Sequence, residues 1–127
     1  MIASAWVALG GALGSVARFK LVGWAIQNHP DWRFPIGTFA VNVLGCLIIG
    51  ALAGLGERAT FMSLDARLFL FTGVLGGFTT FSAFGLETFV LLRRGEVLVA
   101  GSYVGLSVLV GLLALWLGYA IAMPTAK

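Results

Sequence analysis

Four apolar stretches, each long enough to cross a lipid bilayer, leave this chain few folds to adopt. A helix needs roughly 20 mostly apolar residues to cross a hydrocarbon core about 30 Å thick. The stretches cover residues 2–26, 36–56, 67–92 and 98–123. Since 60% of the residues are hydrophobic and only 10% are charged, the chain could not cover a water-facing surface. The sequence therefore predicts one all-α domain over residues 1–127, integral to the cell (inner) membrane.

Four spans place both termini on one side of the membrane, and loop charges barely distinguish the two sides. A clear excess of Lys and Arg normally marks the cytoplasmic side. Two interpretations stay open: the span ends are misplaced and hide the true bias, or the chain inserts in both orientations. The opposing cations are Arg58, Arg67 and Lys127 on one side, against Arg33, Arg93, Arg94 and, if it extends outward, Lys20.

Glycines four residues apart predict close packing between the helices. Small residues at this spacing let backbones approach, which is important where no hydrophobic effect drives helices together. Because the connections are short, consecutive helices are expected to be antiparallel neighbours. Four short helices leave little room for a conduit, so we expect a homo-oligomer. The glycine pairs are Gly10 and Gly14, Gly50 and Gly54, and Gly101 and Gly105.

The third apolar stretch holds the densest group of polar and helix-weakening residues, at positions 73–84. Gly76 and Gly77 each weaken a helix by about 1 kcal/mol, and the adjacent Thr79 and Thr80 invite side-chain bonds to the backbone. A break here would free carbonyls and amides that only protein or a polar cavity could satisfy. Freed carbonyls suit a cation such as Na⁺, whereas amides and hydroxyls suit an anion. An unbroken helix with a close-packed glycine face is the alternative.

Polar and aromatic side chains elsewhere in the spans favour an anion path, because their donors outnumber the one acidic group within the spans. Phenylalanine ring edges carry partial positive charge and could flank a dehydrated anion. Plainer interpretations stay open: an Asn could only tie helices together, an Arg could extend to the interface, and a Phe pair could pack in the core. The candidates are Arg18, Thr38, Asn42, Phe81, Phe84, Glu87, Tyr103 and Ser107.

Enzyme chemistry has little support in this sequence. It contains no Ser-His-Asp set, no metal-ligand cluster and no phosphate-binding loop, and its one histidine, His29, lies in a loop beside Pro30. The lone Cys46 has no His or Cys at metal-ligand spacing, so a small buried side chain is the expected role. We therefore predict that the protein is not an enzyme and does not bind nucleic acid.

At these residues the chain resembles the Fluc (CrcB) family of fluoride channels, over essentially its whole length. The family usually has Ser-Thr-Phe where this chain has Ser82-Ala83-Phe84, and a fourth-span serine where Gly111 stands. Each departure removes one hydroxyl group from the polar side chains that line the family's pathway. Three motifs carry the resemblance: Gly14-x-x-x-Arg18, Gly37-Thr38-x-x-Val41-Asn42-x-x-Gly45, and the run Gly76 to Phe84 followed by Glu87.

The resemblance implies a dual-topology, antiparallel homodimer with two pores that exports cytoplasmic fluoride down its gradient and so lowers fluoride toxicity. It also implies a broken third helix and a structural Na⁺ at the dimer centre, held by the Gly76 and Thr79 carbonyls of both subunits. The implied pore and fluoride residues are Arg18, Thr38, Asn42, Thr80, Phe81, Ser82, Phe84, Glu87, Tyr103 and Ser107.

Two other classes of membrane protein share some of these features. Small dual-topology multidrug exporters also have four spans and work as dimers, but they place an essential Glu in the first span. This chain has only Arg18 and Lys20 there. A haem-binding membrane subunit would normally need histidines within its spans, and the sequence has none there. The fluoride channel is therefore the leading hypothesis and the multidrug exporter is the alternative.

Overall fold

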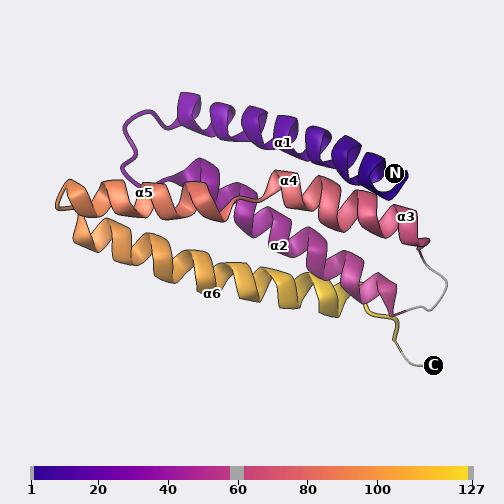
Figure 1. Cartoon of the computed structure of the whole chain (residues 1–127). Helices are drawn as coiled ribbons and strands as arrows, with labels where there is room; N and C mark the ends of the chain where they lie inside the picture. The colour runs from indigo at the N-terminus through magenta and orange to yellow at the C-terminus, as the bar shows by residue number, and fades with distance from the viewer. Residues whose placement is uncertain (1, 58–61, 126–127) are drawn as a thin grey trace.

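The computed structural model describes residues 2–57 and 62–125, which form a bundle of helices (Figure 1). Four helical segments are long and apolar enough to cross a membrane, which confirms the four spans. Arg58 and Lys127, which entered the charge comparison, lie outside the described residues. The elements are α1 (Ile2–Asn28), α2 (Ile36–Gly56), α3 (Leu64–Arg67), η1 (Leu68–Leu75), α4 (Gly76–Phe78), α5 (Phe81–Arg93) and α6 (Val97–Ala122).

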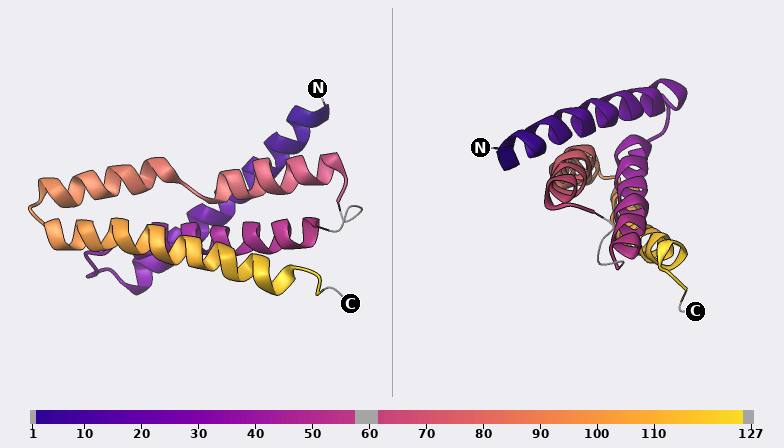
Figure 2. Two further views of the ribbon diagram at one scale, coloured as in Figure 1. Left: turned by 90° about the horizontal axis from the view of Figure 1, so that it is seen from below. Right: turned by 90° about the vertical axis from the view of Figure 1, so that its right-hand side faces the viewer.

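The four spans alternate in direction, and both ends of the chain lie at the same end of the bundle (Figure 1). Consecutive helices are antiparallel and in contact, as expected, but they are not the main neighbours (Figure 1). α2 packs chiefly along α6, and α1 packs chiefly across η1 and α4. Each main pair therefore joins spans of the same direction, while α1 crosses the third span at a steep angle (Figure 2).

Glycine explains this choice of neighbours. A methyl group at Gly10 or Gly14 would collide with the backbone of the third span, and one at Gly50 or Gly54 would collide with the backbone of α6. These two pairs are therefore the close-packing faces that their spacing predicted.

The third predicted pair makes no close contact within the chain. Among the described residues, nothing lies within 4 Å of a methyl group placed at Gly101 or Gly105. α6 instead presents Gly111 and Gly118 to α2, where a methyl group on Gly118 would meet the Leu47 carbonyl. Seven-residue spacing keeps these two glycines on one face as well, so the spacing of four was an incomplete guide.

The third span is broken, but two residues beyond its central glycines. Thr79 and Thr80 are extended, with φ/ψ of −86°/157° and −150°/115°. Gly77 is helical in α4, and a side chain there would collide with the backbone at Gly11. The broken helix and the close-packed glycine face, alternatives in the sequence, thus occur side by side. Just before them, η1 is a π-helix, a wide helical turn that the sequence did not predict.

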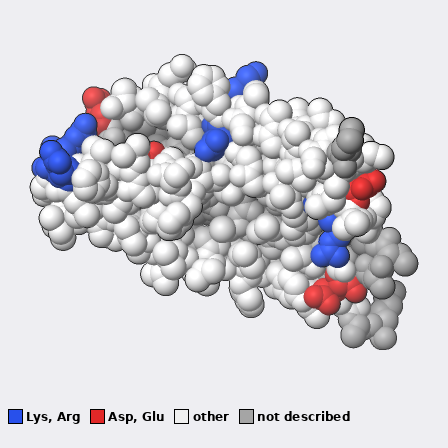
Figure 3. All heavy atoms as spheres, in the orientation of Figure 1, with Lys and Arg blue, Asp and Glu red and all other residues white. Residues whose placement is uncertain are grey.

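Charged side chains gather toward the two ends of the bundle, and the broad region between them is mostly uncharged apart from Lys or Arg groups near its middle (Figure 3). Large apolar side chains cover much of the exterior, including Trp24 at 60% and Trp116 at 64% exposure. This surface suits contact with lipid, as expected for a multi-pass membrane protein.

Candidate ion pathway

The helix break is held by one side chain, Asn42 of α2. The Thr80 backbone N–H donates to Asn42 Oδ1 at 2.8 Å, and Asn42 Nδ2 donates to the Thr80 carbonyl at 3.1 Å. The side-chain amide thus pairs with a peptide unit in the way that a second strand would, so it satisfies backbone groups that the break exposes. Asn42 does tie two helices together, and its second amide hydrogen remains available as a donor.

The side chains of Thr79 and Thr80 form hydrogen bonds with the backbone on either side of the break. Thr79 Oγ1 donates to the Leu75 carbonyl at 2.9 Å, and Thr80 Oγ1 accepts from the Ala83 backbone N–H at 3.2 Å as the N-cap of α5. Ser82 Oγ lies 3.5 Å from Thr80 Oγ1. The predicted tendency of these hydroxyls to bond the backbone is therefore confirmed, and it explains where the break falls.

The break leaves the carbonyls of residues 76–79 without their helical N–H donors, and for two of them, Gly76 and Thr79, the structure shows where the donor has gone. In a continuous helix, the Gly76 carbonyl would accept from the Thr80 N–H and the Thr79 carbonyl would accept from the Ala83 N–H. The first donor is instead taken by Asn42 and the second by Thr80 Oγ1. Gly76 and Thr79 also line the same hollow beside the break. A cation coordinated by carbonyl oxygens would fit this donor set.

Glu87 of α5 connects three helices. Its Oε1 accepts from Thr38 Oγ1 of α2 at 2.6 Å, and its Oε2 accepts from the Tyr103 hydroxyl of α6 at 2.7 Å. Thr38 and Tyr103 are 3% and 0% exposed, so both bonds form away from solvent. Short hydrogen bonds to a charged group are among the stronger ones in proteins. The acidic group predicted within the spans is thus a fixed junction of hydroxyl donors.

The predicted phenylalanine pair divides between two environments. The rings of Phe81 and Phe84 are 5.6 Å apart, and Phe84 lies 5.1 Å from the Tyr103 ring. Phe84 packs against the buried cluster around Tyr103, as the core interpretation expects. Phe81 is 83% exposed within the chain and therefore has no such packing. Sequence reasoning missed Phe34 and Phe39. The Phe34 ring makes edge-to-face contacts with both Phe39 and Tyr103, each with ring centroids 5.3 Å apart.

Three hollows, each of about 340–350 Å³, are linked by shared lining residues, from the connection between α1 and α2 to the break. The outer hollow is lined by Arg33 and Arg94 and reaches Thr38 and Glu87. The middle hollow shares those two residues and adds Arg18, Ala83 and Thr80. The inner hollow shares Thr80 and adds Asn42, Thr79, Gly76 and Phe81. Their common lining residues make the three hollows a candidate pathway, and Arg18 faces inward rather than only toward the interface.

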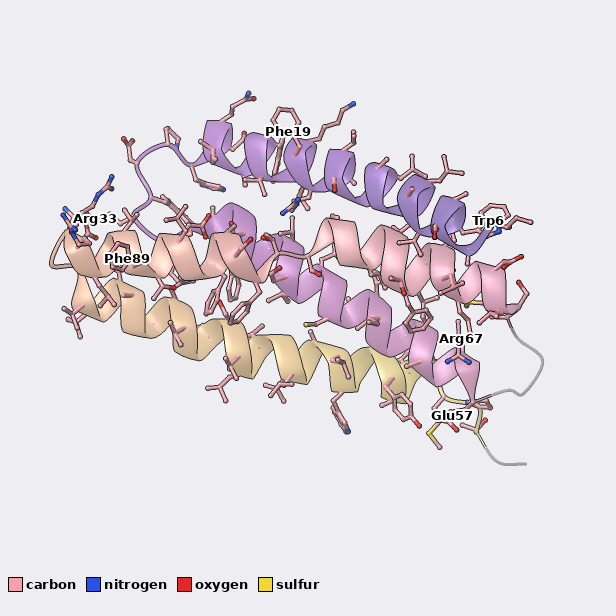
Figure 4. All side chains as sticks on the ribbon, viewed as in Figure 1. Trp6, Phe19, Arg33, Glu57, Arg67 and Phe89 are labelled. Atoms are coloured by element: carbon pink, nitrogen blue, oxygen red, sulfur yellow. The ribbon has the colours of Figure 1, made fainter. Side chains whose placement is uncertain are left out.

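The other half of the bundle is packed differently. There the backbone of α1 lies directly against η1 and α4 at Gly10 and Gly14. Glu57 and Arg67 mark this end, whereas Arg33 and Phe89 mark the end where the outer hollow lies (Figure 4). We call the residues around the outer and middle hollows the open half and the glycine contacts of α1 with the third span the sealed half. The inner hollow lies beside the break and continues past it along η1, where Phe71 and Leu75 line it.

Most predicted site residues meet along the pathway. Tyr103 donates to Glu87 and its ring contacts the Phe84 ring. Ser82 lies beside Thr80. Ser107 is apart from these contacts: its Oγ is buried with no hydrogen-bond partner among the described residues. Arg33, Arg94 and the half-buried Cys46 also line hollows, and sequence reasoning did not select them. Only their placement in three dimensions could have indicated this role.

Comparison with known proteins gives a consistent result. The family model described as CrcB-like protein, Camphor Resistance (CrcB), matches residues 5–119. A protein of Methylobacillus flagellatus is 57% identical over 95% of this chain and 94% of its own length. Proteins of Hyphomonas neptunium and Rhizobium etli are 54% and 47% identical, covering 88% and 95% of this chain and 88% and 96% of their own. All three are named fluoride-specific ion channel FluC.

Proposed function

This chain belongs to the CrcB-like family, and on that premise we propose that it is a fluoride channel that lets cytoplasmic fluoride leave the cell down its electrochemical gradient. The observation that carries the proposal is the high identity, over nearly the whole chain, to proteins named as fluoride-specific channels. The protein is therefore a membrane transporter rather than an enzyme. The relatives do not favour the alternative of a multidrug exporter.

The pathway offers what a small, strongly hydrated anion needs. Fluoride gives up its water only if short hydrogen bonds replace it, and the free amide hydrogen of Asn42 can supply one. Thr80 and Ser82 add hydroxyls near the break. The edge of the Phe81 ring adds weak positive charge in the inner hollow. Chloride is larger and would fit such contacts less well.

A second copy of the chain, inserted upside down, would complete this route. In one chain the hollows reach from one end to the central break and a short way along η1, and the contacts of α1 with the third span close the side beyond the break. An antiparallel partner would place its own open half over the sealed half of the first chain. It would also cover Phe81, which is exposed by itself. We therefore infer a dual-topology homodimer with two pathways.

The same geometry supports a structural sodium ion at the centre of that dimer. The Gly76 and Thr79 carbonyls have lost their helical donors. Two such pairs, brought together by an antiparallel partner, would give four oxygen ligands. A bound Na⁺ would supply positive charge that offsets the partial negative charge at the end of α4. The protein's part is to hold the break open through Asn42 and Thr80.

The channel function is tested by ion efflux from liposomes that contain the purified protein, with a fluoride electrode and a chloride electrode read in parallel. We expect rapid efflux of fluoride without chloride. Phe81→Ile keeps an apolar side chain but removes the ring edge, so it should reduce fluoride efflux while the protein still folds. Absence of fluoride efflux from the folded wild-type protein would overturn the proposal.

Topology and sodium are tested separately. Thr125→Cys in a Cys46→Ala background provides a single thiol near the end of the chain. If the chain inserts both ways, an impermeant maleimide should label about half of these thiols from each side of the membrane. Labelling from one side only would contradict dual topology. Replacing Na⁺ by N-methylglucamine should lower the unfolding temperature of the detergent-solubilised dimer. An unchanged temperature over a wide range of Na⁺ concentration would contradict the structural ion.

A further inference from the structure

The outer hollow is lined by two arginines and one carboxylate, Glu87, and a second carboxylate, Glu96, lies beside one of the arginines. Arg33 comes from the connection between α1 and α2, and Arg94 comes from the turn between α5 and α6. Both line the hollow whose inner end is formed by Thr38 and Glu87. Lys and Arg side chains gather at this end of the molecule (Figure 3). The outer hollow thus has two cationic side chains on the connections that border it.

Glu96 opposes one of these arginines. Its Oε2 lies 3.9 Å from Arg33 Nη1, and its side chain is 20% exposed against 74% for Arg33. The same Oε2 is buried without a hydrogen bond among the described residues. The carboxylate is thus placed where it reduces the positive field at the entrance, although a direct hydrogen bond does not hold it. Arg94 has no carboxylate within salt-bridge distance in the described part of the chain.

We propose that the outer hollow is an anion-concentrating entrance, in which Arg33 and Arg94 attract fluoride and Glu96 attenuates that attraction. The proposal rests on the channel function but assigns these three residues a role in rate rather than in selectivity. A cleft with charges of one sign and low-dielectric walls raises the local concentration of counter-ions. Val22, Ile26 and Val90 supply the apolar walls, and Arg33 and Arg94 outnumber the one carboxylate in the lining, Glu87, whose oxygens accept hydrogen bonds from Thr38 and Tyr103.

Trp32 provides a reporter that does not depend on conduction. It is 56% exposed, lines the outer hollow and stacks on His29 with ring centroids 4.3 Å apart. In full-length protein whose other tryptophans, Trp6, Trp24 and Trp116, are replaced by Phe, its fluorescence can be quenched by iodide. Iodide is a large anion that samples the entrance, and neutral acrylamide samples its accessibility alone.

At low ionic strength, Arg94→Gln should lower the iodide quenching constant of Trp32 about two- to threefold, and Glu96→Gln should raise it by a similar factor. Fluoride efflux at low fluoride concentration should change in the same directions. Both changes should disappear near 1 M salt, where the screening length is only about 3 Å. Acrylamide quenching should stay constant. Arg93→Gln is the matched control, because Arg93 lies over the Phe89 ring, 6.0 Å from its centroid, and does not line the hollow.

Equal iodide quenching in wild type, Arg94→Gln and Glu96→Gln would overturn the entrance proposal. Parallel changes with acrylamide would also overturn it, since they would report altered accessibility rather than an electric field. An effect of Arg93→Gln as large as that of Arg94→Gln would assign the field to the whole end of the bundle instead of the hollow. If quenching follows the expected order but the wild type passes no fluoride, the entrance stands and the channel function fails.

Discussion

The open and sealed halves of this bundle use the same helices in opposite ways. In the sealed half, α1 meets the third span backbone to backbone, and glycine is the contact residue on both sides. In the open half, the same two spans diverge around hollows lined by Arg18, Thr38 and Glu87. The two threonines of the break separate the halves. Small side chains thus anchor the scaffold, and the anchoring lets the polar half keep space for an ion.

The two halves are stabilised by different kinds of interaction. Close packing in the sealed half is non-directional and fails when volume is added. The open half depends on directional bonds from Asn42, Thr38 and Tyr103, so it fails when a donor or acceptor is removed. Substitutions that add volume or remove a polar atom should therefore separate the two halves experimentally.

The largest effect is expected in the sealed half. Gly14→Leu would drive a side chain into the backbone at Val74 and Phe78, so we expect a loss of about 3 kcal/mol or more, or failure to accumulate folded protein. Thermal unfolding in detergent and the yield of folded protein would measure this. Gly23→Ala in the same helix is the control, because nothing lies within 4 Å of a methyl group there. Equal tolerance of both variants would remove the distinction between the halves.

Loss of the Asn42 amide should come next. Asn42→Ala leaves the Thr80 N–H and carbonyl without partners, at a cost of about 1–3 kcal/mol, and we expect fluoride efflux to fall at least tenfold. Asn28→Ala is the matched control: that side chain also donates to a carbonyl, of Trp24 at 2.8 Å, but it is exposed. Wild-type efflux from Asn42→Ala would show that the break does not require this pairing.

A smaller effect is expected at the Glu87 junction. Thr38→Val keeps the side-chain shape and removes one of the two hydroxyl donors to Glu87, so stability should fall by about 1–2 kcal/mol and efflux should decrease while folding is retained. Unfolding temperature and electrode measurements on one preparation would test both. If stability falls but efflux is unchanged, Glu87 is a structural junction and lies off the ion's route.

The smallest effect is expected at the end of the sealed half. Tyr119→Phe removes an exposed hydrogen bond to Glu57 at 3.0 Å, and we expect no measurable change in unfolding temperature or efflux. A clear loss of efflux would mean that the pathway extends through this end within one chain. The inference that a second copy completes the route would then need revision.

Much of the site was predictable, because the relevant residues are costly in a membrane and so stand out in the sequence. Asn42, Glu87 and the two threonines were selected as polar residues at bilayer depth. The structure pairs Asn42 with Thr80 at the break and, in a separate set of hydrogen bonds, Glu87 with Thr38 and Tyr103. Their individual partners were not predictable. Which atom bonds which depends on the crossing of α2 over the third span, and no spacing within one helix encodes that crossing.

Sequence alone determined that this chain spans a membrane four times and that its third span is weak at the centre, because bilayer thickness and backbone satisfaction act on each segment by itself. Only the tertiary structure decided that α2 pairs with α6 and α1 with the third span, that the break falls at Thr79 and Thr80, and that Gly101 and Gly105 are left open. These outcomes depend on which helix faces compete for each other, and that competition is settled only when all four spans pack together.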